Sequence, residues 1–183
     1  MTETGNSRQR LIFAGLGAVS IAFHLGLIFS GLVPNLIARP LHMMLALPWV
    51  FVLAARSRAE RLSGWALMLA GLISCAYILI NEAELADQYG ALEGNGQILM
   101  AAALLIVVLE MARRAISWPL PLVAALALAY GLLGQHLPGE FGHPGLPAAS
   151  FLGTLTIAEG GIWGSLTGIS VNIVAVFIIM GAV

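Results

Sequence analysis

Three ionisable residues lie close together at the end of one apolar stretch. Glu110 precedes Arg113 and Arg114 by three and four residues, so one turn of a helix places the carboxylate beside both guanidinium groups. A carboxylate within a membrane often serves as a proton relay or coupling group. Near the end of a membrane helix it can instead form an interfacial ion pair whose arginines reach water. We favour the ion pair, because this position avoids most of the cost of burying a charge.

Arginine and histidine also occur inside apolar stretches. Arg39 and His42 lie three residues apart on one predicted helical face. They would either attract an anionic ligand or acidic partner surface, or anchor the helix at the outer membrane interface. His24 lies near the middle of another apolar stretch. We expect a neutral imidazole there, hydrogen-bonded to a neighbouring helix, rather than a proton carrier.

Small residues recur at every fourth position near the carboxyl end, at Gly160, Gly164 and Gly168, and Asn172 continues the series. On a helix this spacing allows close approach of a second backbone, and the Asn172 amide would bond across the contact. The alternative is a discontinuous helix of the type that forms transporter sites. We favour close packing.

The segment from His136 to His143 contains two imidazoles and Glu140, which in principle could ligate a metal ion. Three such residues without a fourth partner are weak support for zinc, and the intervening glycine and proline residues favour a loop. The sequence also contains none of the common hydrolase, zinc-protease, phosphate-loop or paired-cysteine motifs. We therefore expect no metal, no cofactor and no enzymatic activity. An intramembrane enzyme using Glu110 or His24 is a less favoured alternative.

The elements that position these residues must be embedded in a lipid bilayer. Hydrophobic residues make up 60% of the 183, charged residues only 9%, and the mean hydropathy is +0.95. A soluble domain carries about a quarter charged residues, so this chain has too few of them to cover the surface of a soluble fold. No basic tract suggests a nucleic acid partner.

Long apolar runs predict an all-α polytopic bundle, because a helix needs roughly 20 apolar residues, and at least about 17, to cross the hydrocarbon core. After a polar loop, Leu146 to Ala158 is too short to span comfortably, and Glu159-Gly160-Gly161 interrupts the apolar sequence. This sixth region is therefore broken or re-entrant, and Ile162–Val183 follows it as a final apolar helix. The five predicted spans are Leu11–Ser30, Leu36–Ala55, Leu62–Ile80, Gln97–Ala112 and Ala115–Gly134.

The eight basic residues are all arginine, and seven of them lie at alternate ends of the predicted spans. Arginine accumulates on the cytoplasmic side of membrane proteins, so this pattern predicts a cytoplasmic amino terminus. Arg39 is the exception. Glu82, Glu84, Asp87 and Glu93 cluster in a loop without arginine, on the predicted opposite side. The seven arginines are Arg8, Arg10, Arg56, Arg58, Arg61, Arg113 and Arg114.

The order of several short motifs resembles the amino-terminal part of the fused permease of tripartite ATP-independent periplasmic (TRAP) transporters, specifically the class paired with TAXI-type solute receptors. The resemblance extends along most of the chain, and it rests on the order and spacing of the motifs. The motifs are Arg39-Pro40-Leu41-His42, Leu109-Glu110-Met111-Ala112-Arg113-Arg114, Leu137-Pro138-Gly139, His143-Pro144-Gly145, Gly161-Ile162-Trp163-Gly164 and Phe177-Ile178-Ile179-Met180-Gly181-Ala182.

The resemblance implies one part of a secondary transporter in a bacterial inner membrane. Residues 1–114 would correspond to the small four-helix subunit and residues 115–183 to the start of the large subunit. An ion gradient would drive organic acid uptake, and a periplasmic solute-binding protein would deliver the substrate. The remainder of the large subunit is the other implied partner.

The sequence also departs from the family. The glycine-, serine- and asparagine-rich segments that form the family's ion and substrate sites are missing, and Ser165-Leu166-Thr167-Gly168 replaces an Ile-Pro-Leu-Gly-like run. We therefore expect a fragment that serves as a membrane scaffold and does not transport alone. The alternative is a stand-alone membrane interaction protein without transport activity.

Overall fold

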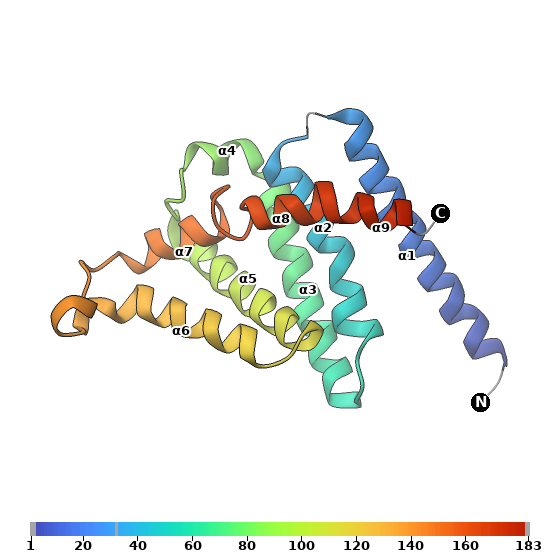
Figure 1. The fold of residues 1–183 in the computed structure, drawn as a ribbon, viewed down its shortest axis with the longest axis horizontal. Coiled ribbons are helices and arrows are strands. Elements are labelled where there is room, and N and C mark those ends of the chain that lie inside the picture. The colour runs from blue at the N-terminus through green and yellow to red at the C-terminus, as the bar shows by residue number, and fades with distance from the viewer. Residues whose placement is uncertain (1–2, 32, 182–183) are drawn as a thin grey trace.

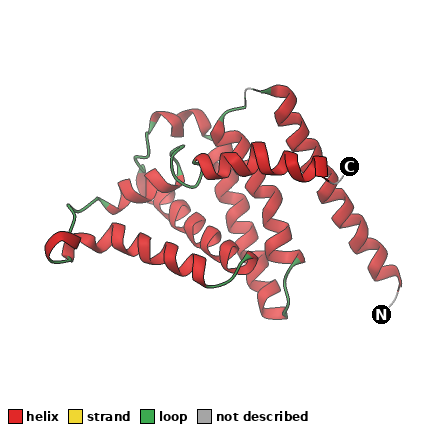
Figure 2. Ribbon diagram, viewed as in Figure 1, coloured by secondary structure: helices red, strands yellow, loops and turns green. Residues whose placement is uncertain are grey.

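The fold is built from helices alone throughout residues 3–31 and 33–181, the part of the chain that the computed structural model describes (Figures 1 and 2). The expected all-α class is therefore confirmed. The helices are α1 (Glu3–Ser30), α2 (Asn35–Pro48), η1 (Trp49–Leu53), α3 (Arg58–Ile80), α4 (Glu82–Asp87), α5 (Gly94–Ala115), α6 (Pro119–Leu133), η2 (Gly134–His136), η3 (Gly139–Phe141), α7 (Ala148–Thr156), α8 (Ser165–Ile169), η4 (Ser170–Val174) and α9 (Ala175–Gly181).

Four of the described helical segments are long and apolar enough to cross a membrane, and they match the first, second, third and fifth predicted spans. Helix α5 contains the predicted fourth span, but it is not among the four. Its apolar run, Ile98–Leu109, is shorter than the roughly 17 residues that a crossing needs. The prediction of five spans is thus not confirmed. The four segments are Arg10–Ser30, Asn35–Leu53, Arg58–Ile80 and Pro119–His136.

The carboxyl-terminal region differs from the expected long helix. The apolar helix begins only at Ser165, three residues after the predicted start at Ile162, and continues to Gly181, the last residue that the structure describes. Before it, the chain turns sharply: the Ile162 amide donates to the Leu155 carbonyl at 2.8 Å, and the Gly164 amide donates to Gly161. The short predicted segment ahead of this turn forms α7, which packs against α5.

The core lies between α2, α3 and α5. Leu47, Cys75 and Leu104 contribute to it from these three helices, and each is fully buried. Ile157 and Trp163 join the same cluster from the connection between α7 and α8. Helix α1 lies outside this core, where it contacts α2, η4 and α9.

The arginine-bearing ends of the helices lie toward the same end of the molecule. In Figure 1 the start of α1, the connection from α2 to α3 and the end of α5 are at the lower end of the molecule, whereas α4 is at the upper end. The acidic residues of α4 are therefore far from the seven arginine positions. Helix α6 runs at a steep angle to α3 in the same view.

The close approach of α3 to η1 requires a glycine at position 64. Ser57 caps α3, because its hydroxyl accepts a hydrogen bond from the Glu60 amide at 3.1 Å. About two turns after this cap, α3 approaches η1 so closely that a Cβ atom on Gly64 would overlap the carbonyl oxygen of Phe51. The same Cβ would lie 3.1 Å from Nη1 of Arg114. Only glycine fits here without moving one of the two helices.

We predict that Gly64→Ala lowers the free energy of unfolding by about 1–3 kcal/mol, because α3 and η1 must separate to admit the methyl group. Gly26→Ala is the matched control, since a Cβ at Gly26 meets no atom within 4 Å. Denaturant unfolding in detergent micelles, followed by circular dichroism, measures both. Equal midpoints for the two variants would contradict the close contact at Gly64.

Candidate functional site

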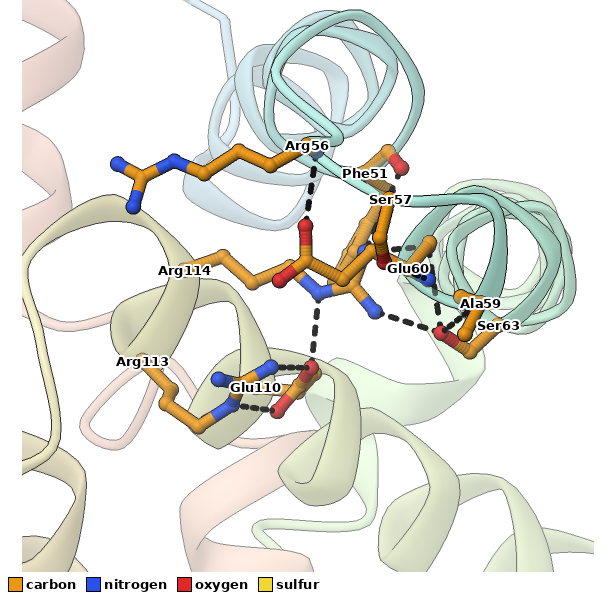
Figure 3. A network of polar contacts seen from close by, with 9 residues as sticks. All are labelled: Phe51, Arg56, Ser57, Ala59, Glu60, Ser63, Glu110, Arg113 and Arg114. Carbon is orange, nitrogen blue, oxygen red and sulfur yellow. Dashed lines mark hydrogen bonds and ion pairs between the residues drawn. The ribbon is translucent and has the colours of Figure 1, made fainter.

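Glu110 is the centre of a polar network at the arginine end of the bundle (Figure 3). Arg113 donates through Nε and Nη2 to the two carboxylate oxygens, both at 2.6 Å. Arg114 adds a third bond from Nε to Oε1 at 2.7 Å. Such forked pairing is the strong form of a carboxylate–guanidinium contact. The spacing along α5 accounts for it, because positions three and four residues apart share one helical face.

Arg114 connects this pair to the neighbouring helices. Its Nη1 donates to the Glu60 carbonyl and its Nη2 to the Ser63 hydroxyl, each at 2.9 Å. The guanidinium also lies over the Phe51 ring, 5.1 Å from its centroid. The Arg114 side chain is only 8% exposed, while that of Glu110 is 22% exposed. The end of α5 is thereby fastened to the turn between η1 and α3.

The hydrogen bonds to Glu110 limit its ability to take up a proton. Its two oxygens accept three bonds from two cations, so proton uptake would have to break a forked pair. The cavity beside the network measures only about 80 Å³ and is lined by Arg56, Glu60, Arg113 and Arg114 among others. The geometry is that of an ion pair that holds helices together. It differs from the favoured interfacial pair in that the Arg114 side chain does not reach water but is 8% exposed and bonds α3.

Arg39 lies near the other end of the bundle and points inward. It donates through Nη1 to the Trp163 carbonyl, and its guanidinium packs on Gly168, where a Cβ would lie 2.8 Å from Nη2. Trp163 is fully buried, and its Nε1 donates to the Thr156 carbonyl at 2.6 Å. Arg39 therefore bridges α2 to the turn that precedes α8.

A directional series of hydrogen bonds joins α1, α2 and η4. Nδ1 of His24 lies 2.7 Å from the Ser20 carbonyl, which can only accept, so this nitrogen carries the proton. Nε2 of a neutral His24 then accepts from Nδ1 of His42 at 2.9 Å. Nε2 of His42 lies 3.4 Å from the Ser170 hydroxyl, which donates to it. This is the cross-helix imidazole bond expected for His24.

The histidines of the loop after α6 do not converge on a metal site. His143 contacts two carbonyl oxygens, Nδ1 with that of Pro144 at 2.7 Å and Nε2 with that of Tyr130 at 3.0 Å. These two contacts, in that order, raise the pKa of the His143 imidazole. His136 lies beside the Gln135 amide instead. Within residues 3–31 and 33–181, no three histidine, cysteine or acidic side chains are placed to share an ion.

Two adjoining hollows lie between α1, α2 and η4, and His24 borders both. The polar cavity, about 360 Å³, is lined by Arg39, Asn35 and Asn172 together with the end of α1. The apolar groove, about 340 Å³, is lined by Gly17, Ile21, Trp49, Val174, Ile178 and Ile179 among others. Arg39 and Asn172 are residues that the sequence pattern indicates, whereas Asn35, the first residue of α2, carries no such signal.

The structure brings together some of the predicted residues and separates others. Arg39 meets Gly168, and His42 meets Ser170. Gly160 and Gly164 lie in the turn before α8, so the four-residue spacing does not form one helical stripe. No protein-family model, curated protein or solved structure matches the chain.

We predict that Glu110→Gln lowers the free energy of unfolding by about 1–3 kcal/mol, because two guanidinium groups lose their charge-assisted bonds. Glu140→Gln is the control, since Glu140 is exposed in the loop after α6. Both are measured by denaturant unfolding in micelles. A Glu110→Gln protein as stable as the control would show that the carboxylate does not hold the helices together.

Proposed function

We propose that the chain is the membrane scaffold of an ion-gradient-driven, solute-receptor-dependent permease of the TRAP type, which takes up organic acids across a bacterial inner membrane. Residues 1–114 form its small-subunit-like part and residues 115–183 the beginning of its large subunit. The scaffold braces a moving transport domain against the bilayer and does not transport alone. The remainder of the large subunit and a periplasmic solute-binding protein complete the machine.

The observation that carries this proposal is the contact between Arg39 and Trp163. These residues belong to two of the motifs on which the resemblance rests, and 124 positions separate them. Their hydrogen bond joins α2 to the carboxyl-terminal part of the chain, and the packing of α7 on α5 adds a second junction. A scaffold that is continuous with the start of a transport subunit needs contacts of this kind between residues 1–114 and residues 115–183.

We further propose that α5 crosses the bilayer as the fourth helix of the scaffold, giving five spans with α6. The positions of its two ends support this. Helix α5 follows α4 at one end of the bundle and reaches the turn between η1 and α3, which is the amino-terminal end of α3, at the other (Figure 1). It therefore connects the same two ends of the bundle as α3 does.

The orientation that we propose places the seven arginine positions in the cytoplasm and α4 in the periplasm. Membrane insertion disfavours translocation of arginine, which supports this assignment. Glu84, Asp87 and Glu93 are exposed at the α4 end. They form the surface on which the solute-binding protein docks, and complementary charge there speeds the encounter.

Cysteine accessibility tests the orientation. We predict that a membrane-impermeant maleimide labels Glu84→Cys in intact cells, whereas Arg58→Cys is labelled only after the membrane is permeabilised. Both residues are exposed, and the native Cys75 is fully buried, so background labelling is low. The reverse pattern would invert the proposed topology.

Receptor-dependent uptake tests the function itself. We predict that the double variant Glu84→Lys, Asp87→Lys in the complete transporter lowers uptake about tenfold at low salt, because like charges then oppose the receptor. The loss should shrink at high salt, where ions screen exposed charges beyond roughly 10 Å. Uptake is measured with a labelled organic acid in proteoliposomes that contain the receptor.

Glu140→Lys is the matched control, as an exposed acidic residue away from α4. It should leave uptake unchanged. Full uptake by the double variant at both salt concentrations would contradict receptor docking on this surface. Uptake by the 183-residue chain alone would contradict its role as a scaffold that depends on the rest of the permease.

A further inference from the structure

The polar cavity and the apolar groove follow one another along α1. The polar cavity is bordered by Leu27 and Ile28 near the end of this helix, and the groove by Gly17 and Ile21 near the middle of its apolar span. From Ile28 back to Gly17 a helix rises roughly 16 Å, at about 1.5 Å per residue. That length is close to one leaflet of a bilayer whose hydrocarbon core is about 30 Å thick.

Arg39 brings a positive charge to the polar cavity, and no carboxylate within the described residues forms an ion pair with it. The only ion pairs within the described ranges belong to Glu110. Glu159 does not line the cavity, and its carboxylate accepts a bond from the Asn35 amide at 3.3 Å. A guanidinium has five N–H donors, and Arg39 gives one bond, to the Trp163 carbonyl. An arginine within a membrane-spanning segment is costly unless an anion, a backbone acceptor or water satisfies it.

The apolar groove continues from this charge without another charged side chain. Its walls are mainly the side chains of Ile21, Trp49, Val174, Ile178 and Ile179. A free phosphate or carboxylate would occupy the polar cavity and leave the groove unfilled. A molecule with an anionic head and an acyl chain fits both hollows, because its charge meets Arg39 while its chain lies along α1.

We propose that the two hollows together form a binding site for one anionic phospholipid from the outer leaflet of the membrane. Its phosphate accepts hydrogen bonds from Arg39, its polar head lies beside Asn35 and Asn172, and one acyl chain occupies the groove past His24. The lipid joins α1 to α2 and η4 along a face where protein contacts are few. The choice of the outer leaflet rests on the proposed orientation, whereas the site itself rests on residues of the chain and does not depend on the proposed permease role.

Titration of phosphatidylglycerol into the detergent-solubilised chain, read by native mass spectrometry, tests the site. The wild-type chain should retain one lipid at a concentration where Arg39→Gln binds about tenfold more weakly, as expected for a lost charge-assisted bond. Arg61→Gln, an exposed arginine at the opposite end, should bind like the wild type. Equal affinities of all three proteins would overturn the role of Arg39.

Gly17→Leu tests the groove, because a side chain at this position projects into open space that the acyl chain would occupy. Gly15→Leu makes the same change on the same helix outside the groove, and no atom lies within 4 Å of its Cβ either. Gly17→Leu should lose the retained lipid while Gly15→Leu keeps it. Circular dichroism verifies that both variants are equally helical. Equal retention would overturn the placement of the acyl chain.

Two ligands separate a lipid from a soluble anion. Glycerol 3-phosphate carries the anionic head without acyl chains, and it should bind far more weakly than phosphatidylglycerol. Phosphatidylcholine carries a neutralised head, and it should also bind more weakly. Tight binding of glycerol 3-phosphate would identify a soluble-anion site and overturn the lipid assignment. Equal binding of the two lipids would show that the site does not select an anionic head group, and it would overturn the proposal of an anionic-lipid site.

Discussion

The placement of Arg114 is the constraint on which the arrangement of the helices depends. Its guanidinium is almost fully buried, so each donor must find an acceptor. Glu110, the Glu60 carbonyl and the Ser63 hydroxyl supply them, and the Phe51 ring covers one face. Since these partners belong to α5, α3 and η1, satisfying one side chain positions three helices at once. Movement of α3 or η1 away from α5 would leave buried N–H donors of Arg114 without acceptors.

The bundle satisfies its second inward-pointing arginine in a different way. Arg39 bonds a backbone carbonyl and packs on Gly168, so it links α2 to the carboxyl-terminal helices without neutralising its charge. Arg114 has Glu110 beside it, whereas Arg39 has amides and a cavity. The two arginines thus differ in their surroundings: Arg114 is paired with a carboxylate in a closed network, whereas Arg39 borders a cavity and has no ion-pair partner within the described residues.

Hydropathy and charge predict much of this fold but not its irregular parts. The first three spans and the fifth emerge from apolar runs alone, and the Glu110 pairing follows from helical spacing. The interruption at Glu159-Gly160-Gly161 is predicted, but the favoured packing of Gly160, Gly164 and Gly168 on one helical face is wrong, because a four-residue repeat is the same in sequence whether or not the backbone is helical. The π-helical turns η1 and η4 and the two hollows depend on tertiary contacts that no local pattern contains. Pro48, directly before η1, is the one local signal of an irregularity there.

The hydrogen bonds from Ser170 through His42 and His24 to Ser20 all point the same way. Because each imidazole donates on one side and accepts on the other, no member can reverse its role alone. The Ser20 carbonyl can only accept, so this one backbone oxygen of α1 determines which ring nitrogen of His42 on α2 carries the proton and makes the Ser170 hydroxyl of η4 the donor.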